Sequence, residues 1–287
     1  MSTLKELSIL DPSYSKLLKE THSAPEKLFV RGNFNIKPDD WTIAIVGTRK
    51  PTEYGRTIAR RFAEDLARAG AVIISGLATG IDSEAHRGAL KAGGKTVAVI
   101  GSGLDRASFF PSANWSLAET IAKENGTVIS EYAEGTPALP HHFPERNRII
   151  AGLSQGVIVV EAQEKSGASI TARLALEENR DVFAVPGSIF SPTSALPNRL
   201  IKEGATPITS ADDVMDFYGK TKSSIPPANG SFNGLEAIII EALSEPRTID
   251  DLKQMTKAET GPLQASLSLL ELNGTIAEIA HGQYQKI

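Results

Sequence analysis

A short run of residues directly after a buried strand could bind phosphate. Residues 43–46 (Ile-Ala-Ile-Val) are all apolar, which is typical of a central parallel strand buried on both faces. They are followed by Gly47, which permits a tight turn, by the hydroxyl of Thr48, and by the cations Arg49 and Lys50. A helix that begins here would offer free backbone N–H groups to an anion. The run therefore predicts a phosphate-binding corner, with an ordinary strand-to-helix turn and two solvated cations as the alternative.

Loops of similar composition follow the later strands. Because the carboxyl ends of parallel strands share one edge of a sheet, we expect these loops to converge. Together they would form a groove for a polyanion, bound by guanidinium groups and by backbone N–H groups in glycine turns. Tight turns and surface ion pairs are the alternative. The further candidates are the loop from Gly76 to Gly80, the run Gly101-Ser102-Gly103, the helical triplet Arg146-Asn147-Arg148, and the run Lys165-Ser166-Gly167.

Several kinds of catalytic or cofactor site are not supported by the sequence. The pair Gly101 and Gly103 lacks the third glycine of a dinucleotide site, because Arg106 occupies that position. No phosphate-loop or Gly-x-Ser-x-Gly motif occurs, and the absence of cysteine excludes thiolate catalysis and disulfides. The adjacent His141 and His142 would point in opposite directions, so we expect them to form a polar loop surface. His86 is expected to be a packed or capping histidine within a helix. We therefore predict no catalytic residue, no metal and no cofactor.

The composition is that of a folded protein in a reducing compartment. Of the 287 residues, 41% are hydrophobic and 22% are charged, which suffices for a large core and a small additional domain. There is no apolar run of membrane-spanning length and no basic, apolar leader, so we expect a cytoplasmic protein without a membrane partner. The net charge of −4 is carried entirely by residues 232–287, which hold 4 basic and 8 acidic side chains. Any site for an anion must therefore be local and lie in the first part of the chain.

The hydrophobic pattern predicts an α/β fold of the Rossmann-like, doubly wound type with a mainly parallel sheet, followed by a small winged-helix domain. Short apolar runs alternate with segments of helical periodicity from residue 41 onward. We expect helical turns at 4–10 and 14–18, and a short strand at 27–31. The later strands are expected at 43–46, 71–75, 95–100, 127–130, 156–161 and 182–185, which ends the run, and the last helix of this part at 194–203. The predicted domains are a lead-in at 1–40 that covers a sheet edge, a Rossmann-like domain at 41–219, a linker at 220–233, and the winged helix at 234–287.

The predicted winged helix has an unusual charge for a DNA-reading domain. Its third helix, expected at 262–273, contains no Lys or Arg and includes Glu271. Such helices normally place cations and amides against duplex DNA, which would repel a domain of this charge. We therefore expect residues 232–287 to be a protein-interaction module.

The same motifs make the sequence resemble the DNA-processing protein A (DprA, or Smf) family over about residues 25–210. In combination they are highly specific, and the tail resembles the winged helix that many members carry. The motifs are Val46-Gly-Thr-Arg49 with Tyr54-Gly55, Ser75-Gly-Leu-Ala-Thr-Gly-Ile-Asp82 with Ala85-His86, Gly101-Ser-Gly-Leu-Asp105, Phe143-Pro-Glu-Arg-Asn-Arg-Ile-Ile150, Ser166-Gly-Ala-Ser169 and Val185-Pro-Gly187.

The resemblance implies a protein that homodimerises, binds and protects single-stranded DNA, and loads a RecA-type recombinase during natural transformation. By motif position it implies that DNA phosphates contact Arg49 and Lys50, the triplet at 146–148, and the late loop from Lys165 to Ser169. Two departures from the family pattern are the short segment before the first strand and Leu196, where a glycine is expected.

Two other functions stay open at this point. Short members of this family also occur beside toxins in phage-defence modules, so the chain could be the neutralising partner of a cognate toxin. Phosphoribohydrolases that share this Rossmann variant look similar in outline, but they carry a double-glycine loop with a nearby acid. The corresponding loop here, 164–171, has Thr171 or Ala172 near the expected position of the acid. Binding is therefore favoured over catalysis.

Overall fold

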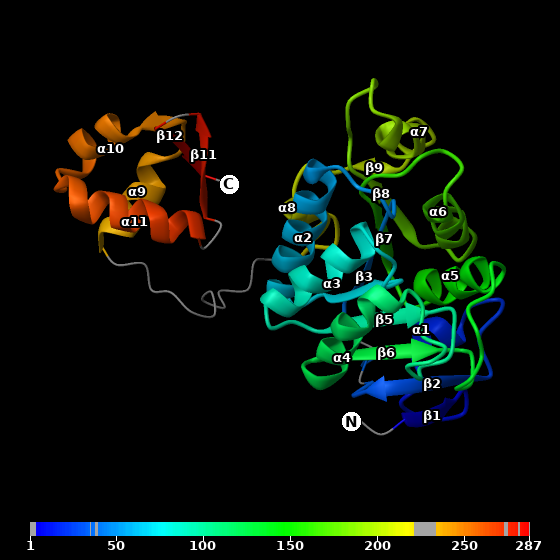
Figure 1. The fold of residues 1–287 in the computed structure, drawn as a ribbon. Helices are drawn as coiled ribbons and strands as arrows, with labels where there is room; N and C mark the ends of the chain where they lie inside the picture. Colours follow the sequence, from blue (N-terminus) through cyan, green and yellow to red (C-terminus); the bar gives the residue numbers. More distant parts are fainter. Residues whose placement is uncertain are drawn as a thin grey trace. The chain divides into compact units, whose positions relative to one another are not determined.

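The computed structural model describes residues 4–34, 36–37, 40–220, 234–272, 275–280 and 282–286. The chain divides into two compact units, Met1–Pro226 and Pro227–Ile287, shown as ribbons in Figure 1. Each unit is described by itself below. The predicted linker falls outside the described residues, except for Lys220.

The first unit is built on a nine-stranded sheet of order β1-β2-β6-β5-β4-β3-β7-β8-β9. The seven strands from β6 to β9 in this order run parallel. The chain moves outward from β3 through β4, β5 and β6, and then returns to β7 on the other side of β3. This reversal is the switch point of a doubly wound sheet, where ligands bind beyond the carboxyl ends of the strands. The strands are β3 (Thr42–Val46), β4 (Val72–Ser75), β5 (Thr96–Ile100), β6 (Gly126–Ser130), β7 (Gly156–Val159), β8 (Asp181–Ala184) and β9 (Thr206–Pro207).

The N-terminal segment belongs to the same sheet. β2 (Lys27–Gly32) pairs antiparallel with β6, and β1 (Leu4–Ser8) pairs antiparallel with β2. The helical turns expected at 4–10 are therefore wrong. The periodicity of this short segment was ambiguous, and its backbone N–H and C=O groups are satisfied by the exposed edge of β2 instead. The helical turn expected at 14–18 corresponds to α1 (Lys16–Lys19).

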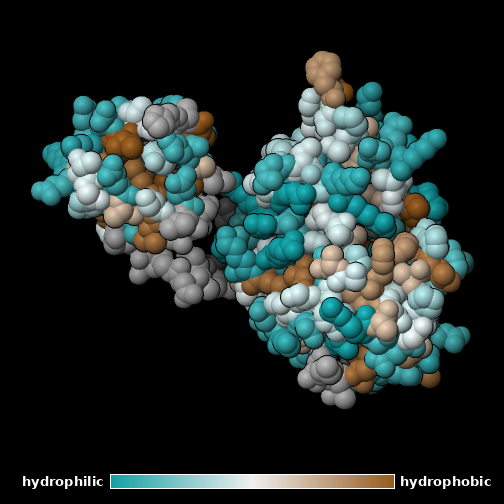
Figure 2. All heavy atoms as spheres, viewed as in Figure 1, coloured by the Kyte–Doolittle hydropathy of each residue, from teal (hydrophilic) through white to brown (hydrophobic). Residues whose placement is uncertain are grey.

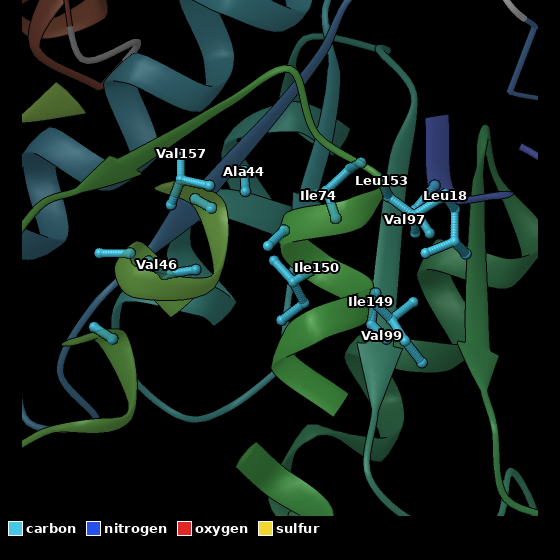
Figure 3. Close-up of a cluster of buried hydrophobic side chains, with 14 of the residues drawn as sticks. Leu18, Ala44, Val46, Ile74, Val97, Val99, Ile149, Ile150, Leu153 and Val157 are labelled. Atoms are coloured by element: carbon cyan, nitrogen blue, oxygen red, sulfur yellow. The ribbon is translucent and has the colours of Figure 1, made fainter. Parts of the chain in front are cut away.

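Helices cover both faces of the sheet, and the central strands β3, β4, β5, β6 and β7 are buried along their whole length (Figure 1). On one face α5 packs against the middle strands, and Figure 3 shows Ile149 and Leu153 beside Val97 and Val99. This face is covered by α1, α5 (His142–Gly152), α6 (Gly167–Glu177) and α7 (Ala195–Lys202). The opposite face is covered by α2 (Glu53–Arg68), α3 (Ile81–Lys91), α4 (Trp115–Lys123) and α8 (Ala211–Phe217), with the short helix η1 (Ser112–Asn114) leading into α4.

The end of this unit extends beyond the prediction. β9 adds a parallel strand after 182–185, which had been expected to end the sheet. α8 follows it and begins with a capping box, in which Ser210 accepts from the backbone N–H of Asp213 and the Asp213 carboxylate accepts from Ser210. The signal for α8 was therefore present as Ser-x-x-Asp before an apolar run. The helix η2 (Pro192–Ser194) precedes α7.

The second unit holds three helices and a small antiparallel sheet of order β10-β12-β11. Its apolar core includes Ile239, Leu252, Leu263, Leu267 and Ile276. A small domain of helices and antiparallel strands is thus confirmed, while its assignment as a winged helix stays a prediction. The elements are α9 (Gly234–Ala242), β10 (Arg247–Thr248), α10 (Ile249–Thr256), α11 (Thr260–Leu272), β11 (Ile276–Ala280) and β12 (Gln283–Lys286).

Candidate nucleic-acid interface

A pocket of about 160 Å³ opens at the carboxyl edge of the parallel sheet. It is formed by the loops that follow β3, β4 and β5, together with the first turns of α5. Its wall combines apolar surface with two guanidinium groups. The lining residues are Arg49, Gly76, Ala78, Thr79, Gly101, Phe110, Pro111, Phe143 and Arg146.

Two aromatic rings and one exposed cation form the mouth of this pocket. The guanidinium carbon of Arg49 lies 5.2 Å from the ring centre of Phe143, an arrangement that favours a cation–π contact. The Phe143 ring centre lies 5.6 Å from that of Phe110, which precedes a cis bond to Pro111. Arg49 is exposed, and it packs on this ring instead of pairing with a described carboxylate. Its remaining donors are therefore available to a ligand.

Arg146 forms the floor of the pocket as a buried clamp. It is 5% exposed and donates from Nη1 to the carbonyl of Gly76, at 2.5 Å, and to that of Val99. These carbonyls belong to the ends of neighbouring strands, so the guanidinium fixes two of the pocket loops. Burial lowers the pKa of Arg146 to about 10, with a further contribution from Arg49, while Asp82 opposes the shift. Burial also raises the pKa of Asp82, although the nearby Arg146 lowers it.

The other two members of the triplet point elsewhere, because consecutive helical residues lie about 100° apart. Asn147 accepts from Arg146 Nε at 3.2 Å and donates to the carbonyl of Gly167 at 3.2 Å, so it ties α5 to the late loop. Arg148 donates from Nη2 to both carboxylate oxygens of Glu131, at 2.5 and 2.6 Å, and from Nη1 to the carbonyl of Ser23. Arg148 therefore holds the N-terminal segment and does not line the pocket.

The loop after β3 is shaped by contacts with Glu161, which follows β7. A Cβ atom on Gly47 would lie 2.7 Å from the carbonyl oxygen of Glu161, so the glycine is required for close packing. The same carbonyl accepts from Thr48 N at 2.6 Å, and the Thr48 hydroxyl accepts from the backbone N–H of Lys50 at 3.2 Å. Lys50 is exposed beside the pocket residue Arg49.

Glu161 holds the start of α2, a role that the sequence did not reveal. Its side chain is buried and accepts from the backbone N–H of Thr52 at 2.9 Å and from the Thr52 hydroxyl at 2.6 Å. Thr193 also donates to it at 3.2 Å. The feature of the sequence that could have indicated this role is one acidic residue directly after the apolar run 156–160. Since both carboxylate oxygens accept hydrogen bonds, this group fixes the loop that carries Arg49.

The glycine run after β5 contributes unequally. Gly101 lines the pocket, where a Cβ would lie 3.2 Å from the carbonyl oxygen of His142. Ser102 is fully buried, and its hydroxyl accepts from the backbone N–H of Phe110 at 3.3 Å. Gly103 donates to the carbonyl of Thr136 at 2.9 Å and faces away. Ser102 thus supports the aromatic wall of the pocket from behind.

The late loop forms the start of α6 and does not line the pocket. Lys165 is exposed, and the Ser166 hydroxyl is buried without a hydrogen-bond partner among the described residues. Ser169 donates its hydroxyl to the carbonyl of Ser166 at 2.6 Å. Because no side chain caps α6, its first backbone N–H groups can donate hydrogen bonds to an anion. Asn147 connects this helix start to the clamp of Arg146.

The histidines do not form a reactive site. His142 is buried and stacks on Tyr132 with ring centres 3.9 Å apart, so the expected polar loop surface is wrong for His142, although His141 is exposed. The first turn of α5 carries His142 under the loop after β6. His86 is fully buried within α3, as expected. Among the residues that the structure describes, no group of three or more His, Cys, Asp or Glu side chains could hold a metal.

The helices described include none with the length and hydrophobicity of a membrane span.

The fold and the pocket define a class of protein. A doubly wound parallel sheet with small-residue loops, exposed cations and helix starts at its carboxyl edge is a Rossmann-like binding domain. Comparison with known proteins gives the family. Residues 5–219 match the family of the DNA recombination-mediator protein A, and the chain belongs to that family.

Individual relatives agree with this assignment. The chain is 43% identical over 213 residues to the DNA processing protein DprA of Bacillus subtilis. The matched region covers 74% of this chain and 71% of the relative. Among solved structures it is similar to DNA processing protein A of Streptococcus pneumoniae, with 45% identity, a TM-score of 0.69, and coverage of 75% of this chain and 74% of the other. It is also similar to the protein from Helicobacter pylori, with 29% identity, a TM-score of 0.67, and coverage of 76% and 98%. The H. pylori protein has a single-stranded DNA binding mode.

Proposed function

We propose that the chain binds single-stranded DNA at the carboxyl edge of the sheet, with an unpaired base in the pocket. The observation that carries this proposal is the exposed Arg49 guanidinium on the ring of Phe143, inside a pocket of about 160 Å³. An unpaired base has two flat faces that stack on aromatic rings or guanidinium groups, whereas a paired base keeps its faces inside the duplex. The geometry therefore favours single strands. The H. pylori relative, which binds single-stranded DNA, supports the same conclusion.

Phosphates would be bound around the pocket and not on its floor. Lys50 and Lys165 are exposed, and the uncapped start of α6 offers N–H groups next to Lys165. Arg146 would serve as the clamp that shapes the site, because its Nη1 is occupied by two carbonyls. Arg148 would stabilise the fold through Glu131.

The bound strand would be handed to a RecA-type recombinase, and the protein would act as a homodimer. The family description as a recombination mediator supports the first statement. For the second, the loop after β8 carries Ile189 and Phe190, which are 83% and 90% exposed. Adjacent apolar side chains with such exposure are commonly covered by a protein partner. We accordingly propose a cytoplasmic role in DNA recombination and natural transformation.

Equilibrium binding to fluorescent oligo-dT would test the base pocket. We expect Phe143→Leu to weaken binding by about 5- to 150-fold, because stacking of one base contributes about 1–3 kcal/mol. Phe217→Leu is the matched control, since Phe217 is a half-exposed ring on α8. Arg49→Ala should weaken binding and flatten its salt dependence by about one counterion.

Equal binding by wild type, Phe143→Leu and Arg49→Ala would contradict the proposed site. Tighter binding to duplex than to single strands would contradict the proposed ligand. Release of the base from AMP or CMP would instead support the phosphoribohydrolase alternative.

A further inference from the structure

Helices α2 and α3 present a basic surface that the pocket does not include. The basic helix face consists of exposed cations, whose side chains are 37–54% exposed. Figure 2 shows hydrophilic residues over much of the surface where α2 lies. These cations outnumber the carboxylates that contact them. The face consists of Arg56, Arg60, Arg61 and Arg68 on α2, and of Arg87 and Lys91 on α3.

One buried carboxylate holds two of these cations. The Glu84 side chain is 5% exposed and pairs with Arg60, at 2.5 Å, and with Arg87, at 2.7 Å. Arg60 and Arg87 are 51% and 47% exposed, so their outer donors face solvent. The carboxylate cannot neutralise both guanidinium groups. Glu84, Arg60 and Arg87 form a unit with a net positive charge, and the buried carboxylate fixes the position of both cations.

A second unit lies further along the helices and joins three cations, Arg61, Arg68 and Lys91, to two acids, Glu64 and Asp65. Glu64 is 11% exposed and pairs with Arg68 on its own helix and with Lys91 on α3, at 3.2 Å. Arg68 also contacts Asp65 at 3.7 Å. Ordinary surface pairs in this chain are different, because Arg173 and Glu177 on α6 match one cation to one exposed acid. In both units the cations outnumber the acids, and their exposed side chains leave donors available to a further anion.

Close packing of the two helices fixes the spacing between the units. A Cβ atom on Gly88 would overlap the backbone carbonyl of Arg60, so α2 and α3 touch at this point without an intervening side chain. Glu84 and Arg87 therefore lie directly beside Arg60. Because this contact holds the two helices against each other, their backbones lose little conformational freedom when the face binds an extended ligand.

Both helices begin at the rim of the pocket. Arg49 and Thr79 line the pocket, and they lie just before α2 and α3, respectively. Since both helices follow neighbouring parallel strands, they run in the same direction away from that rim. The 16 residues of α2 span about 24 Å at 1.5 Å per residue, which is long enough to contact several successive phosphates of an extended single strand.

We propose that single-stranded DNA leaving the pocket continues along the basic helix face, where its phosphates bind the two cation units. This inference rests on the proposed function, because it extends the path of the same strand. A backbone polyanion fits this surface because its cations recur along the axes of both helices. An acidic protein could bind this face without reaching the pocket. A single DNA strand can contact both the pocket and the face, which favours DNA as the ligand.

The test removes one cation from each unit and leaves both buried acids paired. In Arg87→Gln/Lys91→Gln, Glu84 keeps Arg60 and Glu64 keeps Arg68, so the melting temperature should stay close to that of wild type. The control is Lys16→Gln/Lys27→Gln, which removes the same charge from one-to-one pairs with Glu20 and Glu6.

Binding to two oligo-dT lengths separates this face from the pocket. An oligonucleotide of about 5 residues is close to the smallest known single-strand footprint, so we expect it to occupy the pocket alone. One of about 20 residues is long enough to extend beyond the pocket. We expect the double variant to bind the long probe at least about fivefold more weakly, with a salt slope reduced by ~1.4, and the short probe normally. The control should bind both probes within about twofold of wild type.

Equal binding of the long probe by the double variant and the control would overturn the inference and leave the pocket proposal intact. An equal loss for both probe lengths would also overturn it, because the effect would then be a general change in charge. If wild type binds neither probe, the proposed function itself fails, and the inference fails with it.

Discussion

Replacing Arg146 should destabilise the fold more than it changes contacts with DNA. In Arg146→Met, the carbonyls of Gly76 and Val99 lose their donor, and Asp82, which is 7% exposed, loses its main compensating cation. Removing one partner of a buried pair costs about 3–5 kcal/mol, which for a chain of this size corresponds to a melting temperature lower by about 6 to 20 °C. Thermal unfolding followed by circular dichroism would measure the change.

The pH dependence of this loss identifies its cause. Burial raises the folded-state pKa of Asp82 above 3.8, so its contribution to stability is complete at low pH and decreases as pH rises toward the folded pKa. Without Arg146 that pKa rises further, because the cation lowers it in the wild type. The difference in stability between wild type and the variant should therefore be larger at about pH 7 than at pH 3.8.

A second substitution checks the assignment to Asp82. Asp82→Asn/Arg146→Met leaves no carboxylate at position 82, so we expect part of the stability to return and the additional pH dependence to disappear. Equal melting temperatures for Arg146→Met and wild type at both pH values would refute the role of Arg146 as a buried clamp.

Three further predictions concern other parts of the chain. Burial, assisted by Arg146 and Arg87, lowers the pKa of His86 from 6.5 to about 3, so the unfolded state takes up the proton first and stability decreases as pH falls below 6.5. We expect a loss of about 2 kcal/mol between pH 6.5 and pH 5 in urea titrations, and His86→Leu should reduce this slope. Glu161→Ala should cost about 1–3 kcal/mol because it leaves the Thr52 N–H without its partner, whereas Glu161→Gln should preserve most of the stability; equal losses would argue against this hydrogen bond. Deleting residues 232–287 should leave oligo-dT affinity within about threefold, or ~0.7 kcal/mol, in fluorescence anisotropy. A larger loss in a folded protein would contradict an interaction role for this acidic segment.

Local patterns predicted most of the regular structure. The alternation of short apolar runs with helical periodicity indicated the central strands and most helices, because strands covered on both faces must be apolar throughout. The segment 4–8 was misread, since its pairing with β2 provides a backbone partner that the local pattern does not show. The helix α8 was missed although its capping box is visible in the sequence.

The sequence by itself determined the fold class, the family motifs and the edge of the sheet where the small-residue loops meet. These properties follow from hydrophobic periodicity and from the direction of parallel strands, which are local and topological features. Only the tertiary structure separated the candidate cations by role, because burial and hydrogen-bond partners depend on distant residues. Arg49 lies exposed on the ring of Phe143, whereas Arg146 is buried under the pocket and Arg148 is paired with Glu131. The sequence alone does not distinguish these three arginines. They differ in role because each side chain contacts a different part of the fold.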